Sequence, residues 1–90
     1  MDKIKILMRE KIMKNVAIPK MGMSTTEVEI MSWKVKVGDH VKEEDPLVEI
    51  ESEKTSIEIA SDVSGVMAEI LYKEGEEVPV GSVICKIDVD

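Results

Sequence analysis

Two segments of the chain resemble each other at a constant separation, and this internal repeat limits the folds that the chain can adopt. Aligning residues 34–50 with residues 71–87 gives matched pairs 37 residues apart: Gly38 with Gly75, Val41 with Val78, Leu47 with Ile84, Val48 with Cys85 and Ile50 with Ile87. Stacked arrays generally need at least three repeats. The repeat therefore predicts two interlocked halves in one domain, joined immediately before Lys54.

The hydrophobic pattern of each half is that of short β-strands. Valine and isoleucine recur at alternate positions, and glycines and Asp45-Pro46 interrupt them at spacings typical of all-β domains. We expect strands at residues 15–19, 28–34, 46–52, 55–60, 65–72 and 82–88, with shorter extended segments near Val41 and Val78. From Val28 to Trp33 apolar residues occupy both faces, so either both faces are partly buried or a β-bulge intervenes.

Charge and length exclude several classes of function. The 90 residues suffice for one compact domain, and the net charge of -7 disfavours nucleic acid and anionic membranes, whose phosphates would be repelled. The single cysteine, Cys85, allows no intramolecular disulfide and fits a reducing compartment, so we expect a cytoplasmic domain. No apolar run approaches the roughly 20 residues that span a bilayer, and residues 1–13 resemble neither a signal peptide nor an anchor.

Few side chains are suited to catalysis. The one histidine, His40, lies beside Gly38 and Asp39 and is interpreted as a solvated loop residue, whereas Cys85 lies in an apolar run and is interpreted as a small core residue. Neither has a partner motif nearby. We therefore expect no catalytic residue, no metal ligand and no independent enzymatic activity.

Lys54 is predicted to lie at the tip of a β-hairpin. Val48, Ile50 and Ser52 share one strand face and Thr55, Ile57 and Ile59 share another, so the alternation changes phase between residues 52 and 55. Pairing Ser52 with Thr55, Ile50 with Ile57 and Val48 with Ile59 restores a common face. Glu53 and Lys54 then form a two-residue loop whose register is set by burial, with the amine near Glu51, Glu53 and Glu58. By itself, such a lysine is an ordinary exposed turn residue.

Five motifs in order change that interpretation. They are Pro19-Lys20-Met21-Gly22-Met23-Ser24-Thr25-Thr26-Glu27, Val37-Gly38-Asp39-His40-Val41, Glu49-Ile50-Glu51-Ser52-Glu53-Lys54-Thr55, Ser64-Gly65 and Lys73-Glu74-Gly75-Glu76-Glu77-Val78-Pro79-Val80-Gly81. Together they resemble the lipoyl domains of 2-oxo acid dehydrogenase acyltransferases over about residues 15–88. The first motif is most similar to the pyruvate and acetoin types of complex.

The resemblance implies both fold and function. The implied fold is a barrel-sandwich hybrid, a flattened β-barrel of two small antiparallel sheets with pseudo-twofold symmetry. The implied role is that of a carrier in which Lys54, flanked by Glu53 and Thr55, bears lipoic acid in amide linkage. The implied partners are a lipoate-attaching ligase, a thiamin-diphosphate decarboxylase, a coenzyme A acyltransferase and dihydrolipoamide dehydrogenase, and we expect the isolated domain to be a monomer. A tether would raise the effective concentration of its cargo at successive active sites.

Two alternatives remain open. Biotin carriers have a related fold, but their signature is Met-Lys-Met, whereas Glu53 and Thr55 flank Lys54 here. The other alternative is an unmodified β-barrel-sandwich module that only binds proteins. Residues 14–90 are the expected carrier domain, and residues 1–13 are an expected flexible extension, or alternatively a short helix docked through Ile4, Leu7, Met8 and Ile12.

Overall fold

The computed structural model describes residues 11–90, which form eight β-strands. The strands are β1 (Met13–Ala17), β2 (Glu27–Trp33), β3 (His40–Val41), β4 (Pro46–Glu51), β5 (Ser56–Ala60), β6 (Gly65–Ile70), β7 (Glu77–Pro79) and β8 (Val83–Val89). All eight expected extended segments are present. The main difference is that β1 ends at Ala17 rather than at residue 19, because its pairing with β8 shifts after Val16 and Pro19 has no N–H to donate.

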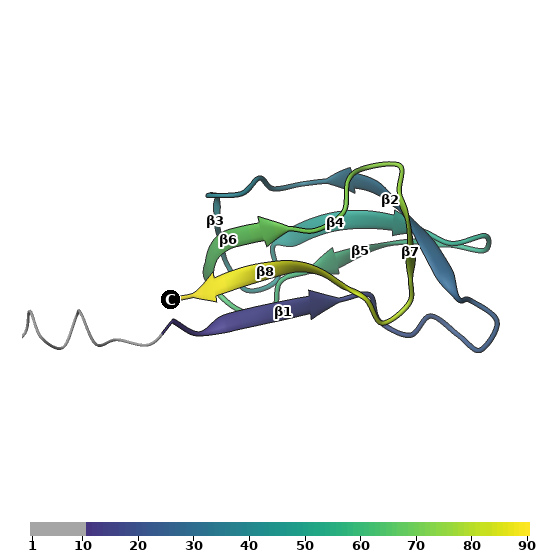
Figure 1. Ribbon diagram of the computed structural model, residues 1–90, viewed down its shortest axis with the longest axis horizontal. Helices are drawn as coiled ribbons and strands as arrows, with labels where there is room; N and C mark the ends of the chain where they lie inside the picture. The colour runs from purple at the N-terminus through teal and green to yellow at the C-terminus, as the bar shows by residue number, and fades with distance from the viewer. Residues whose placement is uncertain (1–10) are drawn as a thin grey trace, which may run out of the picture.

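The strands form two four-stranded antiparallel sheets that pack face to face as a flattened sandwich (Figure 1). One sheet has the order β1-β8-β6-β3 and the other has the order β5-β4-β2-β7. The part of the chain that the structure describes contains no helix, and so none long and apolar enough to cross a membrane. The prediction of an all-β domain made of two small antiparallel sheets is confirmed.

The core lies between the sheets and is filled mainly by side chains at alternate strand positions, while Leu47-Val48 and Ile84-Cys85 are each buried in succession. Branched aliphatic side chains predominate there, as expected for residues that pack on a pleated surface. Cys85 lies among them as a small core residue, as expected. In residues 11–90 the buried apolar side chains are Val16, Ile18, Val28, Ile30, Val41, Leu47, Val48, Ile50, Ile59, Met67, Val78, Ile84, Cys85 and Ile87.

The internal repeat corresponds to a pseudo-twofold symmetry of the sheets. Replacing β1 by β5, β8 by β4, β6 by β2 and β3 by β7 converts one strand order into the other. The strand irregularities repeat too: β2 has a register shift between Ile30 and Ser32, and β6 has one between Met67 and Glu69. The bulge in β2 explains why apolar residues occur on both of its faces, and Met31 is exposed.

The symmetry is broken in the connection that follows the first strand of each half. Ile18 and Ser61 are equivalent by their backbone hydrogen bonds to Ser82 and Asp45, and they lie 43 residues apart. Val28 and Gly65 are equivalent by strand pairing but lie only 37 residues apart. The connection in the first half, which we call the β1–β2 loop (residues 18–26), is therefore six residues longer than its counterpart, which by the same equivalences is residues 61–63.

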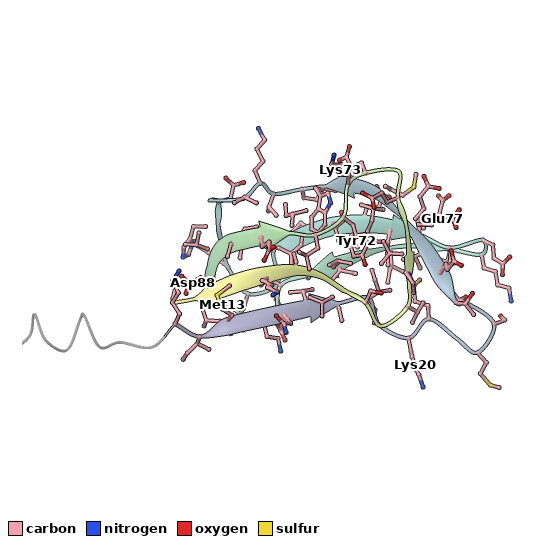
Figure 2. All side chains as sticks on the ribbon, in the orientation of Figure 1. Met13, Lys20, Tyr72, Lys73, Glu77 and Asp88 are labelled. Atoms are coloured by element: carbon pink, nitrogen blue, oxygen red, sulfur yellow. The ribbon has the colours of Figure 1, made fainter. Side chains whose placement is uncertain are left out.

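The long loop and the β4–β5 connection lie at one end of the sandwich, which we call the tip end. In Figure 2, Lys20 and Glu77 mark the tip end, and Met13 and Asp88 mark the opposite end. At that opposite end the N–H of Val89 donates to the carbonyl of Ile12 at 2.8 Å. The beginning and end of the folded body therefore lie side by side, away from the tip end.

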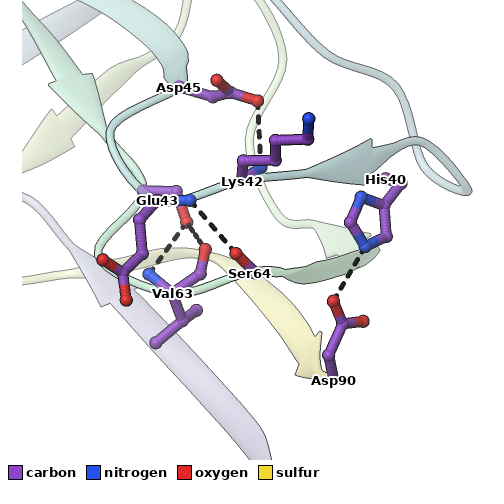
Figure 3. A network of polar contacts seen from close by, with 8 residues as sticks. His40, Lys42, Glu43, Asp45, Val63, Ser64 and Asp90 are labelled. Carbon is purple, nitrogen blue, oxygen red and sulfur yellow. Dashed lines mark hydrogen bonds and ion pairs between the residues drawn. The ribbon is translucent and has the colours of Figure 1, made fainter.

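Polar contacts hold the opposite end together (Figure 3). The ring Nε2 of His40 lies 2.9 Å from Asp90 Oδ2, and the N–H of Glu43 donates to Ser64 Oγ at 3.3 Å. His40 begins β3 and is exposed, rather than lying in a loop. Of the expected extension, residues 1–10 lie outside the described residues, as does most of its alternative helix, and Met13 already belongs to β1.

Candidate functional site

The hairpin of β4 and β5 has the register that the sequence predicts. Ile50 pairs with Ile57 and Val48 pairs with Ile59, while the N–H of Ser52 donates to the carbonyl of Thr55 at 2.8 Å. Glu53 and Lys54 form the bend between the strands, as expected. One detail differs, because Ile50 is fully buried whereas Ile57 is only half-buried at the edge of the core.

A serine side chain stabilises the turn, which sequence reasoning missed. The Oγ of Ser52 accepts hydrogen bonds from the N–H groups of Lys54 (3.3 Å) and Thr55 (3.2 Å), and it lies 3.2 Å from the Thr55 carbonyl as a donor. Serine hydroxyls commonly stabilise turns by bonding backbone groups two or three residues away. The turn is therefore fixed by local hydrogen bonds as well as by burial of the strands, and a serine two residues before the lysine was the available signal.

The side chain of Lys54 is exposed, and its amine points to the β1–β2 loop. Its Nζ lies 3.4 Å from Ser24 Oγ. Within residues 11–90, no carboxylate lies within 4.0 Å of this amine. Glu51 and Glu53 adjoin the bend, but Glu58 pairs with Glu49 further down the hairpin, so the expected ring of three glutamates is incomplete. The hairpin tip thus presents a primary amine to solvent with one hydroxyl as its polar contact.

A shallow groove of about 440 Å³ lies between the β1–β2 loop and the hairpin. Two of its lining residues, Glu27 and Glu77, interact with each other. A side-chain hydrogen bond with Glu77 and the negative charge of Glu77 raise the pKa of Glu27 above its ordinary value. The groove is open and mainly polar, so it presents hydroxyls and carboxylates beside the lysine. Its lining residues are Ser24, Thr25, Thr26, Glu27, Val28, Glu29, Glu51, Ser52, Glu53 and Glu77.

The two residues best suited to nucleophilic or acid-base chemistry lie away from this groove. Burial raises the pKa of the Cys85 thiol to about 12, so the reactive thiolate is disfavoured. His40 lies at the opposite end of the sandwich, against Asp90. Among the described residues, no three His, Cys, Asp or Glu side chains are grouped as metal ligands would be. At the bend of the hairpin, the exposed nucleophilic group is the amine of Lys54.

Comparison with known proteins identifies the family. A family described as "Biotin-requiring enzyme", with biotin and lipoyl attachment domains, matches residues 14–87. The acetyltransferase component of the acetoin cleaving system of Bacillus subtilis is 43% identical over 72 residues, which are 80% of this chain and 18% of that protein. The acetyltransferase component of the pyruvate dehydrogenase complex of Staphylococcus aureus is 44% identical over 71 residues, which are 79% of this chain and 16% of that protein. The chain thus spans less than a fifth of these relatives.

Solved structures give the same result. The lipoyl domain of the 2-oxoglutarate dehydrogenase complex of Azotobacter vinelandii is 30% identical, with a TM-score of 0.70, over 81% of this chain and 92% of that domain. The urea carboxylase of Kluyveromyces lactis shares the fold, with a TM-score of 0.72 at 24% identity, over 88% of this chain and 6% of that protein. The match over residues 14–87, together with the likeness to a whole lipoyl domain, shows that the chain belongs to the biotin and lipoyl attachment family, as a lipoyl domain.

Proposed function

We propose that Lys54 is the lipoyl attachment residue and that the domain is a carrier for acyl groups. The observation that supports this proposal best is the position of the amine, exposed at a two-residue bend where the two halves of the domain meet. Strand register and the Ser52 hydroxyl fix the backbone of that bend. A modifying enzyme that recognises a lysine by its position in the fold needs an amine that is held rigidly and protrudes from the surface.

The residues at the tip end fit an amide-linked lipoyl group. The amine forms no ion pair within the described residues, so attachment breaks no salt bridge when the charge of the ammonium is lost. The open groove beside the loop leaves room for a chain to leave Lys54 without displacing core residues. Bound lipoic acid would supply a disulfide that accepts electrons and an acyl group, while the protein supplies a rigid anchor. Tethering raises the effective concentration of that group at each active site in turn.

The partners follow from the relatives and form part of the proposal. We propose that a lipoate-attaching ligase modifies Lys54, and that a thiamin-diphosphate-dependent decarboxylase or acetoin-cleaving enzyme transfers an acyl group to the lipoyl-lysine side chain, here called the arm. A coenzyme A acyltransferase would then unload it, and dihydrolipoamide dehydrogenase would reoxidise it. The acetoin and pyruvate systems named for the relatives support this assignment. The buried free thiol of Cys85 is in keeping with a reducing cytoplasm, and we propose that the isolated domain is a monomer without catalytic activity of its own.

We propose lipoate rather than biotin because of the residues beside the lysine. Glu53 and Thr55 stand where the biotin carriers' signature has methionines, and both side chains are exposed for reading by a ligase. An unmodified binding module would not require a protruding amine at the junction of the halves.

The test is a pair of labelling reactions on the full chain. One reaction contains lipoic acid, ATP and a lipoate-attaching ligase, and the other contains biotin, ATP and a biotin ligase. Intact mass should increase by one lipoyl group in the first reaction and remain unchanged in the second, with the modified peptide containing Lys54. A biotin increment alone would indicate a biotin carrier, and no increment in either reaction would indicate an unmodified module.

A further inference from the structure

The β1–β2 loop breaks the symmetry of the domain beside Lys54. It is six residues longer than its counterpart in the second half, and within it the hydroxyl oxygen of Ser24 lies 3.4 Å from the Lys54 amine. The equivalent connection at residues 61–63 lies at the opposite end, near Asp90, where residues 11–90 form no hairpin corresponding to the Lys54 bend. The additional residues are thus found in the half of the domain whose loop faces the lysine.

Backbone hydrogen bonds fix both ends of this loop. At its start, the N–H of Ile18 donates to Ser82 at 3.0 Å and the N–H of Gly81 donates to Ile18 at 2.9 Å. At its end, the N–H of Val80 donates to the carbonyl of Thr26 at 2.9 Å. Both ends are therefore tied to the turn between β7 and β8, which restricts where Ser24 can lie.

The Lys54 amine points to a hydroxyl although carboxylates are close to it in sequence. Glu53 precedes Lys54 and Glu51 ends β4, yet neither lies within 4.0 Å of Nζ, whereas Ser24, from a different part of the chain, does. A neutral hydroxyl can accept a hydrogen bond from an ammonium group, from an amine and from an amide N–H. A carboxylate would instead favour the charged ammonium form, which is not a nucleophile.

We infer that Ser24 is a positioning residue for Lys54, an inference that rests on the proposed function. During attachment, Nζ forms a bond to the carbonyl carbon of an activated lipoyl adenylate and the bond from that carbon to the phosphate oxygen breaks. AMP leaves with the electron pair, and Nζ gives up its surplus protons to solvent or to a base of the ligase. Nζ keeps one hydrogen in the amide product. Ser24 accepts a hydrogen bond from Nζ before the reaction and from the amide N–H afterwards. The lipoyl group attached to Lys54 therefore extends from the hairpin along the β1–β2 loop.

The test compares three variants of the full chain: Ser24→Ala, Ser24→Thr and the control Ser56→Ala. Ser56 is an exposed serine on β5, just beyond the hairpin bend, and its hydroxyl has no hydrogen bond to another described residue. The initial rate of lipoylation is measured against the concentration of the domain. Because the loss of one hydrogen bond leaves the amine less well oriented, Ser24→Ala should lower kcat about two- to tenfold with little change in KM. Ser24→Thr should restore kcat, and Ser56→Ala should match the unaltered chain.

A second measurement examines the product. In a domain labelled with ¹⁵N-lysine and then lipoylated, the Nζ–H of the amide should show a nuclear Overhauser contact with Ser24 and slowed exchange with water. Both signals should be lost in Ser24→Ala and should return in Ser24→Thr.

The outcomes separate this inference from the proposed function. An unaltered chain that accepts no lipoate would refute the proposed function itself. Normal lipoylation with equal kcat and equal amide exchange in Ser24→Ala would overturn the positioning role while leaving the carrier function intact. A change in KM alone would also overturn it, because Ser24 would then contact the ligase rather than orient the amine.

Discussion

Glu44 and Gly81 occupy equivalent positions in the two halves of the domain, and both have a positive backbone φ, of 73° and 93°. Each lies in the turn before a long central strand, β4 or β8, and each donates its N–H to the residue that follows the first strand of a half. Within residues 11–90, Glu44 is the only residue other than glycine with a positive φ. The first half therefore holds a residue with a side chain in the strained left-handed conformation, whereas the second half has glycine at the equivalent position.

Glu44→Gly should stabilise the domain. Left-handed backbone costs a side-chain-bearing residue about 1–2 kcal/mol, and the greater freedom of glycine in the unfolded chain offsets part of the gain. The expected increase in the free energy of unfolding is about 0.5–1 kcal/mol, measured by urea denaturation. Glu43→Gly, one residue earlier, is the control and should not stabilise the domain. Equal effects of the two changes would contradict the assignment of strain to residue 44.

Ile50 and Ile57 should differ in their contribution to stability although they face each other. Ile50 is fully buried, so Ile50→Ala should cost about 2–5 kcal/mol of unfolding free energy. Ile57 is only half-buried, so we expect Ile57→Ala to cost about 1–2 kcal/mol. Denaturant unfolding of the two variants checks the order. A larger loss for Ile57→Ala would mean that the hairpin edge is better packed than its exposure indicates.

Gly65 is required by close packing at the start of β6. A Cβ atom there would lie 2.9 Å from Ile87 Cγ2 and would overlap the backbone carbonyl of Asp88. Gly65→Ala should therefore destabilise the domain by about 1–3 kcal/mol, because the sheet must shift to accommodate the methyl group. Val66→Ala, at the next and exposed position, should cost less than about 1 kcal/mol. Thermal unfolding of both variants in parallel would reveal the difference, and similar losses would argue against a steric requirement.

The Glu27–Glu77 pair should make stability depend on pH. Because Glu77 raises the pKa of Glu27 in the folded state, the pair is unfavourable once both carboxylates are charged. The destabilisation is absent below about pH 4, grows as pH rises through the raised folded pKa and is complete above that pKa. Glu77→Gln should raise Tm at pH 7 and have little effect at pH 3.5. A difference in Tm that does not vary with pH would show that the two carboxylates do not interact.

Lys54→Arg should fold normally yet accept no lipoate. Arginine keeps the charge and most of the apolar stem, but its guanidinium stays protonated and is a poor nucleophile. The double change Glu53→Lys with Lys54→Glu preserves composition but moves the amine by one position, and its modification should also fall sharply. Peptide mass mapping after incubation with the ligase measures both effects, with Tm as the control for folding. Strong lipoylation of another lysine in Lys54→Arg would show that residue 54 is not the attachment point.

The strands could be predicted from sequence because burial imposes an alternation of apolar and polar residues on most of their length, the exceptions being the consecutive buried pairs Leu47-Val48 and Ile84-Cys85. A shift of one residue in the β4–β5 pairing would turn the isoleucines of one of the two strands towards solvent, so hydrophobic periodicity alone identifies the register. The repeat at a separation of 37 residues likewise anticipated the equivalence of β4 and β8.

Contacts made by single side chains could not be predicted in this way. Ser52 and Ser24 are small polar residues without periodicity, so the pattern gave no indication that one would bind the bend and the other would face the lysine. The partial exposure of Ile57 was also missed, because alternation gives the face of a residue but not its distance from the sheet edge. Local polar contacts depend on loop geometry, which long-range folding determines.

The side-by-side arrangement of Ile12 and Val89 makes the sandwich a rigid spacer. Any segment joined to either end of the folded body would be attached at the end remote from Lys54. If such a segment is flexible, the whole folded body rotates about that attachment and carries Lys54 with it. A six-residue strand such as β4 spans about 20 Å, and this length is added to the reach of the lysine without the entropy cost of a longer flexible chain. Shortening an attached segment would therefore reduce the distance that the Lys54 amine can reach by a smaller fraction than it reduces the length of the segment.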